Sequence, residues 1–306
     1  MPGETQPQYC GCNLNVQSHW PDAVSAGSVV APTRAPLDAC RSALLAGLIR
    51  SSPNSTPNAK GYVGEASANL VKGVTMADFE ADLRQGNGNE LAGKFCAAHS
   101  SSALAVNVFA PFKSNVSALH LAGTSNFESL HFERKCPHGL VGRRAPNLDV
   151  VATGPEGVVA IESKCLEPLA RHSADFSPAY NAGIRDARRN TAWFREMERL
   201  VAEPRAYSWL DAAQLVKHAF GLAHTFQGQP VTLVYLYWEP SNAAAYRMFI
   251  EHRAETARFA AAVEDDGPRF MAMSYRELWK AWSVQGGTDW LKRHVDRLTT
   301  RYDVAA

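Results

Sequence analysis

PNLDVVATGPEGVVAIESK, residues 146–164, is the stretch that decides the fold. Its first part is apolar and β-branched after Asp149, and its last part is an almost unbroken apolar run that ends in Glu162-Ser163-Lys164. The segment between them, Gly154-Pro155-Glu156-Gly157, combines residues typical of tight turns. The stretch therefore predicts a β-hairpin, and its apolar second arm predicts a strand in the middle of a sheet.

This hairpin would bring ionisable side chains together. Side chains alternate between the two faces of a strand, so Glu162 and Lys164 share one side. Antiparallel pairing places Asp149 near Glu162, and two crowded carboxylates raise each other's pKa unless a divalent cation offsets their repulsion. Asp149, Glu162 and the backbone carbonyl of Ser163 offer the hard oxygen ligands that Mg2+ or Mn2+ prefers. Lys164 is then placed to orient a water molecule or to stabilise negative charge on a phosphate.

The elements on either side of the hairpin predict the rest of the architecture. Before the hairpin, the sequence predicts a helix over 90–109 capped by Asn89 and a strand at 130–133. The hairpin itself supplies strands at 148–152 and 157–164. After it follow helices over 181–201 and 210–226, a strand at 231–237, a helix over 243–263, a strand at 270–273, and C-terminal helices with Trp279, Trp282 and Trp290. A meander followed by a crossover predicts an α/β fold with a mixed central sheet flanked by helices.

The motif Pro146-Asn147-Leu148-Asp149, then twelve residues, then Glu162-Ser163-Lys164 resembles that of the PD-(D/E)XK nuclease superfamily. This superfamily includes restriction endonucleases, repair exonucleases and recombination nucleases. The proline stands three residues before the aspartate instead of next to it. The predicted element order is similar to the family core of helix, three strands, helix, strand. The resemblance implies a restriction-endonuclease-like fold, and a metal-dependent nuclease that hydrolyses phosphodiester bonds in its nucleic-acid partner, DNA.

The resemblance also implies site residues outside the hairpin. Family members often carry a glutamate on the helix before the sheet, the place that Glu90 takes here, although the helix dipole also favours a glutamate in a first turn. Gln214 and His218 share a helix face and resemble the family's Q-x-x-x-Y motif with histidine in the tyrosine place. The resemblance implies that they bind the substrate near the site; a surface pair is the alternative. Glu133 is a candidate ligand of a second metal, but an exposed strand carboxylate is the favoured interpretation.

Basic residues near the motif are candidates for phosphate contacts. Arg143 and Arg144 precede Asp149 on a loop at the mouth of the predicted site. A further set shares one helical stripe and is interpreted as part of a solvated face of mixed charge: Arg185, Arg188 and Arg189. The net charge of +1 argues against a protein that coats nucleic acid nonspecifically, because such proteins carry a strong basic excess.

Composition sets the outer limits of the prediction. The 306 residues are 46% hydrophobic, enough for a sizeable core. Residues 1–60 hold seven of the seventeen prolines and predict an irregular Pro- and Ser-rich arm with one short helix over 37–50, so the nuclease-like domain is predicted over 61–306. The sequence has no apolar run long enough for a membrane helix and no signal-peptide pattern. We therefore expect a cytoplasmic protein.

Two further interpretations concern the cysteines and the function. Cys10 and Cys12 with His19 and Cys40 outline a zinc site, but there is no paired C-x2-C knuckle, so free thiols are favoured. The alternatives to a nuclease are a catalytically inactive nucleic-acid-binding or protein-interaction module of the same fold, and a helix-rich structural protein in which the motif arose by chance. The complete motif favours the nuclease, because a binding module does not need all of it.

Overall fold

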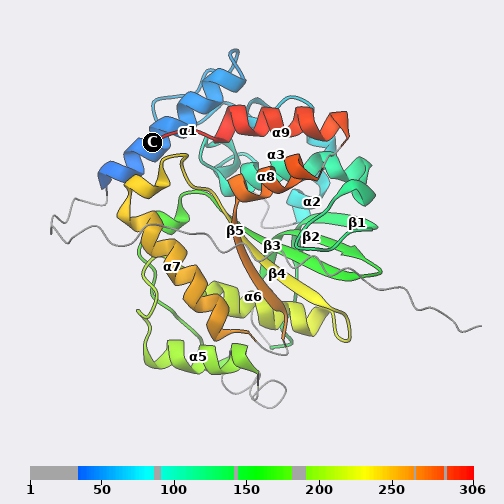
Figure 1. Cartoon of the computed structure of the whole chain (residues 1–306), viewed down its shortest axis with the longest axis vertical. Helices are drawn as coiled ribbons and strands as arrows, with labels where there is room; N and C mark the ends of the chain where they lie inside the picture. Colours follow the sequence, from blue (N-terminus) through cyan, green and yellow to red (C-terminus); the bar gives the residue numbers. More distant parts are fainter. Residues whose placement is uncertain (1–33, 86–90, 141–143, 181–190, 265–266, 286–287) are drawn as a thin grey trace, which may run out of the picture. The chain divides into compact units, whose positions relative to one another are not determined.

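The hairpin at residues 146–164 lies at the centre of a five-stranded mixed sheet in a computed structural model of the chain (Figure 1). The structure describes residues 34–85, 91–140, 144–180, 191–264, 267–285 and 288–306. The strands, in the order in which they pair, are β1 (Ser129–Lys135), β2 (Asn147–Gly154), β3 (Gly157–Lys164), β4 (Val231–Tyr237) and β5 (Arg269–Ser274). The first three form an antiparallel meander, and β4 and β5 are added in parallel. The predicted mixed α/β fold is confirmed.

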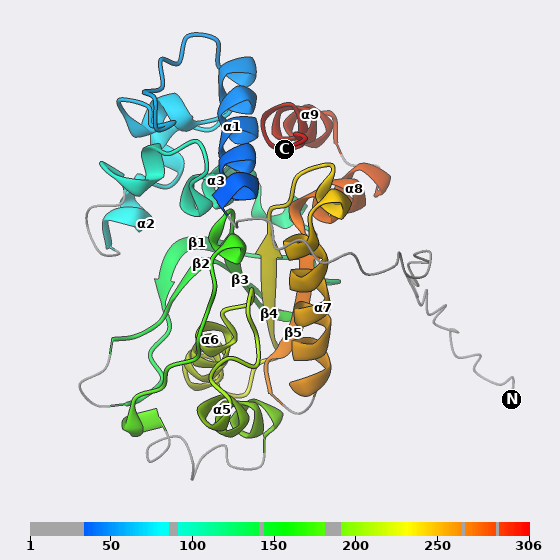
Figure 2. The ribbon, with the colours of Figure 1, turned by 90° about the vertical axis from the view of Figure 1, so that its left-hand side faces the viewer.

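Helices cover both faces of the sheet (Figures 1 and 2). They are α1 (Arg34–Ser51), α2 (Glu80–Gln85), α3 (Ser101–Phe109), α5 (Ala192–Ala202), α6 (Ala212–Thr225), α7 (Arg247–Ala262), α8 (Tyr275–Val284) and α9 (Asp289–Tyr302). Short 3-10 helices lie at Ala66–Asn69, Met76–Asp78, Lys94–Cys96, Ala110–Ser114, Val116–Ala118, Glu167–Leu169 and Ala243–Ala245. No helix in the described part of the chain is long and apolar enough to cross a membrane.

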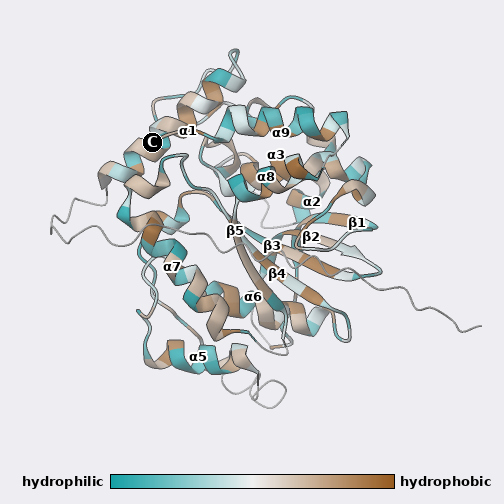
Figure 3. Cartoon of the chain, in the orientation of Figure 1, coloured by the Kyte–Doolittle hydropathy of each residue, from teal (hydrophilic) through white to brown (hydrophobic). Residues whose placement is uncertain are grey.

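Side-chain alternation along β3 separates two hydrophobic cores. Val159 and Ile161 pack with residues of α1, α3, α8 and α9, whereas Val158 and Ala160 pack with residues of α5 and α6. The outer helices α5, α7 and α9 alternate teal and brown in Figure 3, as expected for helices with one apolar face. Because β3 is covered on both faces, it has the near-continuous apolar sequence of a central strand.

Close backbone approach requires glycine at two positions that shape the site. Gly157 pairs with Gly154 across the hairpin turn and has a φ of +133°, and a Cβ there would lie 2.5 Å from the carbonyl oxygen of Pro230. On α6, a Cβ at Gly221 would lie 2.4 Å from the carbonyl oxygen of Cys136. The missing side chain at Gly221 lets α6 lie directly against the chain that links β1 to β2.

The helix predicted over 90–109 is wrong in its first half. Helix α3 begins at Ser101, and the Ser100 side chain accepts the Ala103 N–H as the N-cap, at 3.2 Å. Before it lie a turn at residues 91–93 and the short 3-10 helix Lys94–Cys96. Ala97 is extended, because it forms a β-bridge with Tyr62 and its neighbours form backbone hydrogen bonds with Gly61 and Val63. Tertiary pairing therefore overrides the local helical pattern.

Other predicted helices differ mainly at their ends. The helix expected over 37–50 is α1, which belongs to one compact unit, Thr33–Ala306, with the sheet. It is tied to α9 by Arg301, whose buried guanidinium donates to the carbonyl oxygen of Leu44 at 2.9 Å. Helix α5 is described from Ala192 on, and the predicted part over 181–190 lies outside the described residues.

Candidate active site

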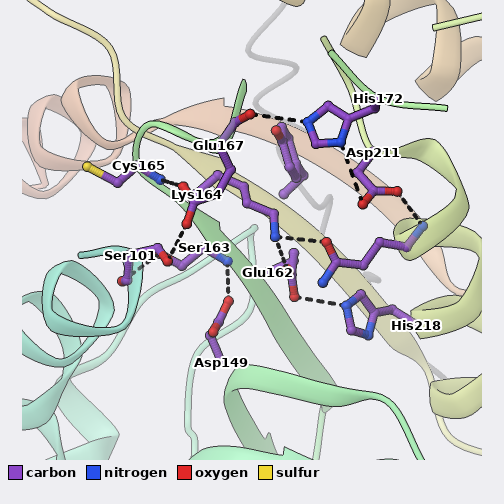
Figure 4. Close-up of polar contacts among 12 residues, drawn as sticks. Ser101, Asp149, Glu162, Ser163, Lys164, Cys165, Glu167, His172, Asp211 and His218 are labelled. Atoms are coloured by element: carbon purple, nitrogen blue, oxygen red, sulfur yellow. Dashed lines mark hydrogen bonds and ion pairs between the residues drawn. The ribbon is translucent and has the colours of Figure 1, made fainter. Parts of the chain in front are cut away.

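The ionisable residues of the hairpin line a cavity of about 1030 Å3 at the carboxyl end of β3. The pairing of Val150 with Ile161 continues by one step to Asp149 opposite Glu162, and both side chains line this cavity. The amino-terminal ends of α3 and α6 supply further walls. The hairpin therefore brings Asp149, Glu162 and Lys164 to one place, as the sequence predicted (Figure 4).

Glu162 is a buried carboxylate between two basic side chains, Lys164 and His218. Its Oε1 accepts the Lys164 ammonium at 2.6 Å, and its Oε2 lies 2.9 Å from Nε2 of His218. Burial alone would raise the pKa of Glu162, but the charge of Lys164 and the contact with His218 outweigh burial and lower the pKa to about 2. The expectation that crowding raises the pKa of both acids is therefore wrong for Glu162.

Asp149 behaves in the opposite way. Its Oδ2 accepts the backbone N–H of Ser163 at 2.6 Å. Burial, followed by the negative charges of Glu162 and Glu133, raises its pKa well above the usual value, and the opposing effects of Lys164 and the Ser163 N–H are too weak to prevent this. Asp149 is thus a desolvated acid, and the positive charge around it is too small to stabilise its ionised form.

Lys164 is held in place by α6. Its Nζ donates to Glu162 and, at 2.8 Å, to Oε1 of Gln214, and its side chain is only 13% exposed. Burial would lower the pKa of Lys164, but the carboxylates of Glu162 and Asp149 raise it, so the amine is a stable cation. Gln214 and His218 therefore share a face, as their spacing predicted, and that face contacts the motif side chains.

Ser163 links the motif to two distant helices. Its Oγ donates to the carbonyl oxygen of Ser101 at 3.2 Å and lies 2.6 Å from the hydroxyl of Tyr275. Because the Ser163 proton is used toward Ser101, Tyr275 donates to Ser163. Tyr275 is the first residue of α8, and its full burial raises its pKa. Sequence reasoning missed it, since no local pattern connects residues 112 positions apart.

Glu133 lies closer to this site than expected. The pairs Phe132–Val150 and Arg134–Leu148 leave Glu133 opposite Asp149. Glu133 has a φ of +50°, a left-handed conformation that is costly for a side chain with a Cβ. It is half-buried and lines the cavity. The favoured interpretation of Glu133 as an exposed carboxylate is therefore wrong.

The remaining predicted residues divide into two groups. Arg144 is exposed and lines the cavity, as expected for a phosphate contact at its mouth. A second group lies outside the described residues: Glu90, Arg143, Arg185, Arg188, Arg189, Cys10, Cys12 and His19. Cys40 is a fully buried free thiol, and burial raises its pKa to about 12.

The donor set decides whether a divalent cation fits. Among the described residues, no group of three or more His, Cys, Asp or Glu side chains is arranged as a metal site. The hard donors are instead two carboxylates, Asp149 and Glu162, and Ser163, whose carbonyl is the third candidate ligand, also lines the cavity. Mg2+ commonly takes one or two carboxylates and completes its octahedron with water and substrate phosphates. The raised pKa of Asp149 is the condition that a bound cation corrects, so these residues fit Mg2+ or Mn2+.

Comparison with known proteins identifies the family. A family model described as "Restriction Endonuclease associating with ARP" matches residues 48–303. No curated protein and no solved structure matches the chain. The match extends from α1 to the end of α9 and so includes the whole sheet and the cavity. The chain therefore belongs to the family Restriction Endonuclease associating with ARP, and its fold is restriction-endonuclease-like.

Proposed function

We propose that the protein is a nuclease of the PD-(D/E)XK type that hydrolyses phosphodiester bonds in DNA with Mg2+ or Mn2+. One observation carries the proposal: the Lys164 ammonium is fixed between Glu162 and Gln214 in a cavity that Asp149 also lines. A divalent cation bound there supplies a Lewis acid for a phosphoryl oxygen and lowers the pKa of a water molecule. Membership of a restriction-endonuclease family supports a phosphodiester hydrolase.

In this proposal each residue has a distinct role. Asp149 and Glu162, with the Ser163 carbonyl, hold the cation. The Lys164 ammonium orients the attacking water and stabilises negative charge that develops on the phosphate. A lysine in this role must stay protonated, and the raised pKa of Lys164 meets that requirement.

Gln214 and His218 are assigned as positioning residues, although the sequence suggested that they bind substrate. Gln214 accepts a hydrogen bond from the Lys164 ammonium, and His218 contacts Glu162, so both act on the motif. Asp211 in turn accepts the Gln214 N–H at 3.0 Å and fixes the first turn of α6. Arg144 is assigned to phosphate contact at the mouth of the cavity. Glu90 and Arg143 stay predictions.

The test is cleavage of circular and linear DNA with Mg2+, Mn2+ or a chelator. We expect cleavage only with a divalent cation, and loss of cleavage in Lys164→Ala, because the lysine acts on the transition state. This variant also loses the buried ion pair with Glu162, so a melting curve checks that it is still folded under the assay conditions. Lys292→Ala, at an exposed position on α9, is the matched control. Equal cleavage by Lys164→Ala and the parent would refute the assignment of the site.

The same experiment separates the nuclease from an inactive module. An inactive module of this fold would bind DNA, and no divalent cation would support cleavage. Circular substrate distinguishes internal cleavage from attack at ends in a single gel. An RNA substrate of the same sequence tests the preference for DNA.

A further inference from the structure

The charges around the cavity leave several cations without a carboxylate partner. The lining contains five lysines or arginines and four carboxylates, and a bound divalent cation adds two positive charges. Within the described residues, Lys94, Lys135, Arg144 and Lys217 form no ion pair, although many other basic side chains of the chain do. The excess of positive charge in the cavity therefore favours binding of a ligand with more than one negative charge.

Two of these cations stand on walls that come from opposite faces of the sheet. Lys94 precedes α3, which packs in the core with Val159 and Ile161, whereas Lys217 is on α6, which packs in the other core. Lys217 Nζ lies 5.1 Å from the centre of the Phe176 ring, a cation–π contact that holds it in the wall. A chain of phosphates that contacts both lysines must cross the cavity, past the motif.

An aromatic side chain stands on the same wall as Lys94. Tyr62 is half-buried and lines the cavity, and the neighbouring His99 meets its ring edge-on at 6.1 Å between centroids. His99 and the β-bridge from Tyr62 to Ala97 fix the ring in this position. A cationic groove with a fixed aromatic ring is the arrangement that binds single-stranded nucleic acid, with phosphates on the cations and a base on the ring.

The depth of the site selects against a double helix. Glu162 is 3% exposed and His218 is 2% exposed, so the reacting phosphate must enter the cavity instead of meeting the motif at the surface. A volume near 1030 Å3 is at the upper end of the range for small-ligand pockets, roughly 300–1,000 Å3. Such a cavity admits a short piece of one strand, whereas a duplex keeps its bases paired and stacked outside it.

We propose that the cavity binds one unpaired nucleic-acid strand, held by Lys94 and Lys217 on either side of the motif and by stacking of a base on Tyr62. This inference rests on the proposed function, since it names the form of nucleic acid that the same site takes. It predicts cleavage of single strands, or of unpaired ends and gaps, in preference to intact duplex.

Binding without metal tests the inference separately from catalysis. Fluorescence anisotropy in EDTA compares a labelled single-stranded oligonucleotide with the same oligonucleotide in a blunt duplex, using the full chain. We expect tighter binding of the single strand. Lys94→Ala and Lys217→Ala should each weaken it and lower the slope of log affinity against log salt by about 0.7. Lys292→Ala should change neither quantity.

Tyr62 has its own matched pair of variants. Tyr62→Ala should weaken single-strand binding about 5-fold or more, whereas Tyr62→Phe keeps the ring and should keep the affinity. Thermal melting of each variant confirms that it is folded. Equal or tighter binding of the duplex, or parental affinity in both lysine variants, would overturn the inference. Strand binding with no cleavage under any cation would instead refute the proposed nuclease and leave the strand site intact.

Discussion

Replacing Glu162 by glutamine should destabilise the metal-free protein at neutral pH by about 3 kcal/mol. The folded structure lowers the pKa of Glu162 from 4.5 to about 2, and each pH unit of such a change corresponds to about 1.4 kcal/mol. The carboxylate is 3% exposed, so solvent screens its contacts with Lys164 and His218 very little. Because the folded pKa lies below the unfolded one, this stability is present above pH 4.5 and is lost as the pH falls toward 2.

The assay is urea unfolding in EDTA for the parent and Glu162→Gln, from neutral pH down to about pH 3. The difference in unfolding free energy should fall by roughly half near pH 3. Glu264→Gln, at an exposed position, is the matched control and should have no effect. Repulsion between two carboxylates alone would make the glutamine variant more stable. A Glu162→Gln protein at least as stable as the parent at neutral pH would therefore show that Lys164 and His218 do not hold this carboxylate.

Three other changes should give measurable effects. Asp149→Asn should stabilise the metal-free protein at neutral pH, because a folded-state pKa above the ordinary value of 3.8 costs stability at every pH above 3.8. Urea unfolding should show no gain below that pH. Tyr275→Phe removes the donor to Ser163 and should raise the Mg2+ concentration for half-maximal cleavage about 10-fold, and an unchanged metal titration would contradict this role. Arg301→Ala should lower the unfolding free energy by about 3 kcal/mol in the same denaturant assay, because the variant loses the buried hydrogen bonds of the charged guanidinium. A change in unfolding free energy near zero, as for an exposed residue, would refute this prediction.

The hairpin and its motif could be predicted because their signals are local. The turn residues at 154–157 fix how β2 pairs with β3. Side chains point alternately to the two faces of a strand, so this pairing determines which side chains meet. The same logic predicted the shared face of Gln214 and His218. Sequence spacing thus predicts on which face of its helix or strand a side chain lies, provided that the predicted helix or strand forms.

The other parts of the site depend on contacts between distant segments. Local pattern favoured a helix before Ser101, but the bridge from Tyr62 to Ala97 prevents it. Glu133 has a positive φ in β1, where that strand pairs with β2, and no residue next to it in the sequence indicates this conformation. Likewise, the low pKa of Glu162 depends on His218, which belongs to a helix beyond the hairpin. Sequence spacing contains no information about such partners.

The hydrogen bond from Tyr275 to Ser163 has a consequence for when the site forms during synthesis of the chain. The Ser163 hydroxyl contacts both the Ser101 carbonyl oxygen and the Tyr275 hydroxyl. These three residues are far apart in the sequence, so they are synthesised at different times. A chain synthesised only as far as β4 has the motif but lacks the strand β5 and the helix that fix it. Domains dominated by such long-range contacts fold late and slowly. The motif is therefore fixed only after the last quarter of the chain has been synthesised and has folded, because Tyr275 of α8 is the residue that contacts Ser163.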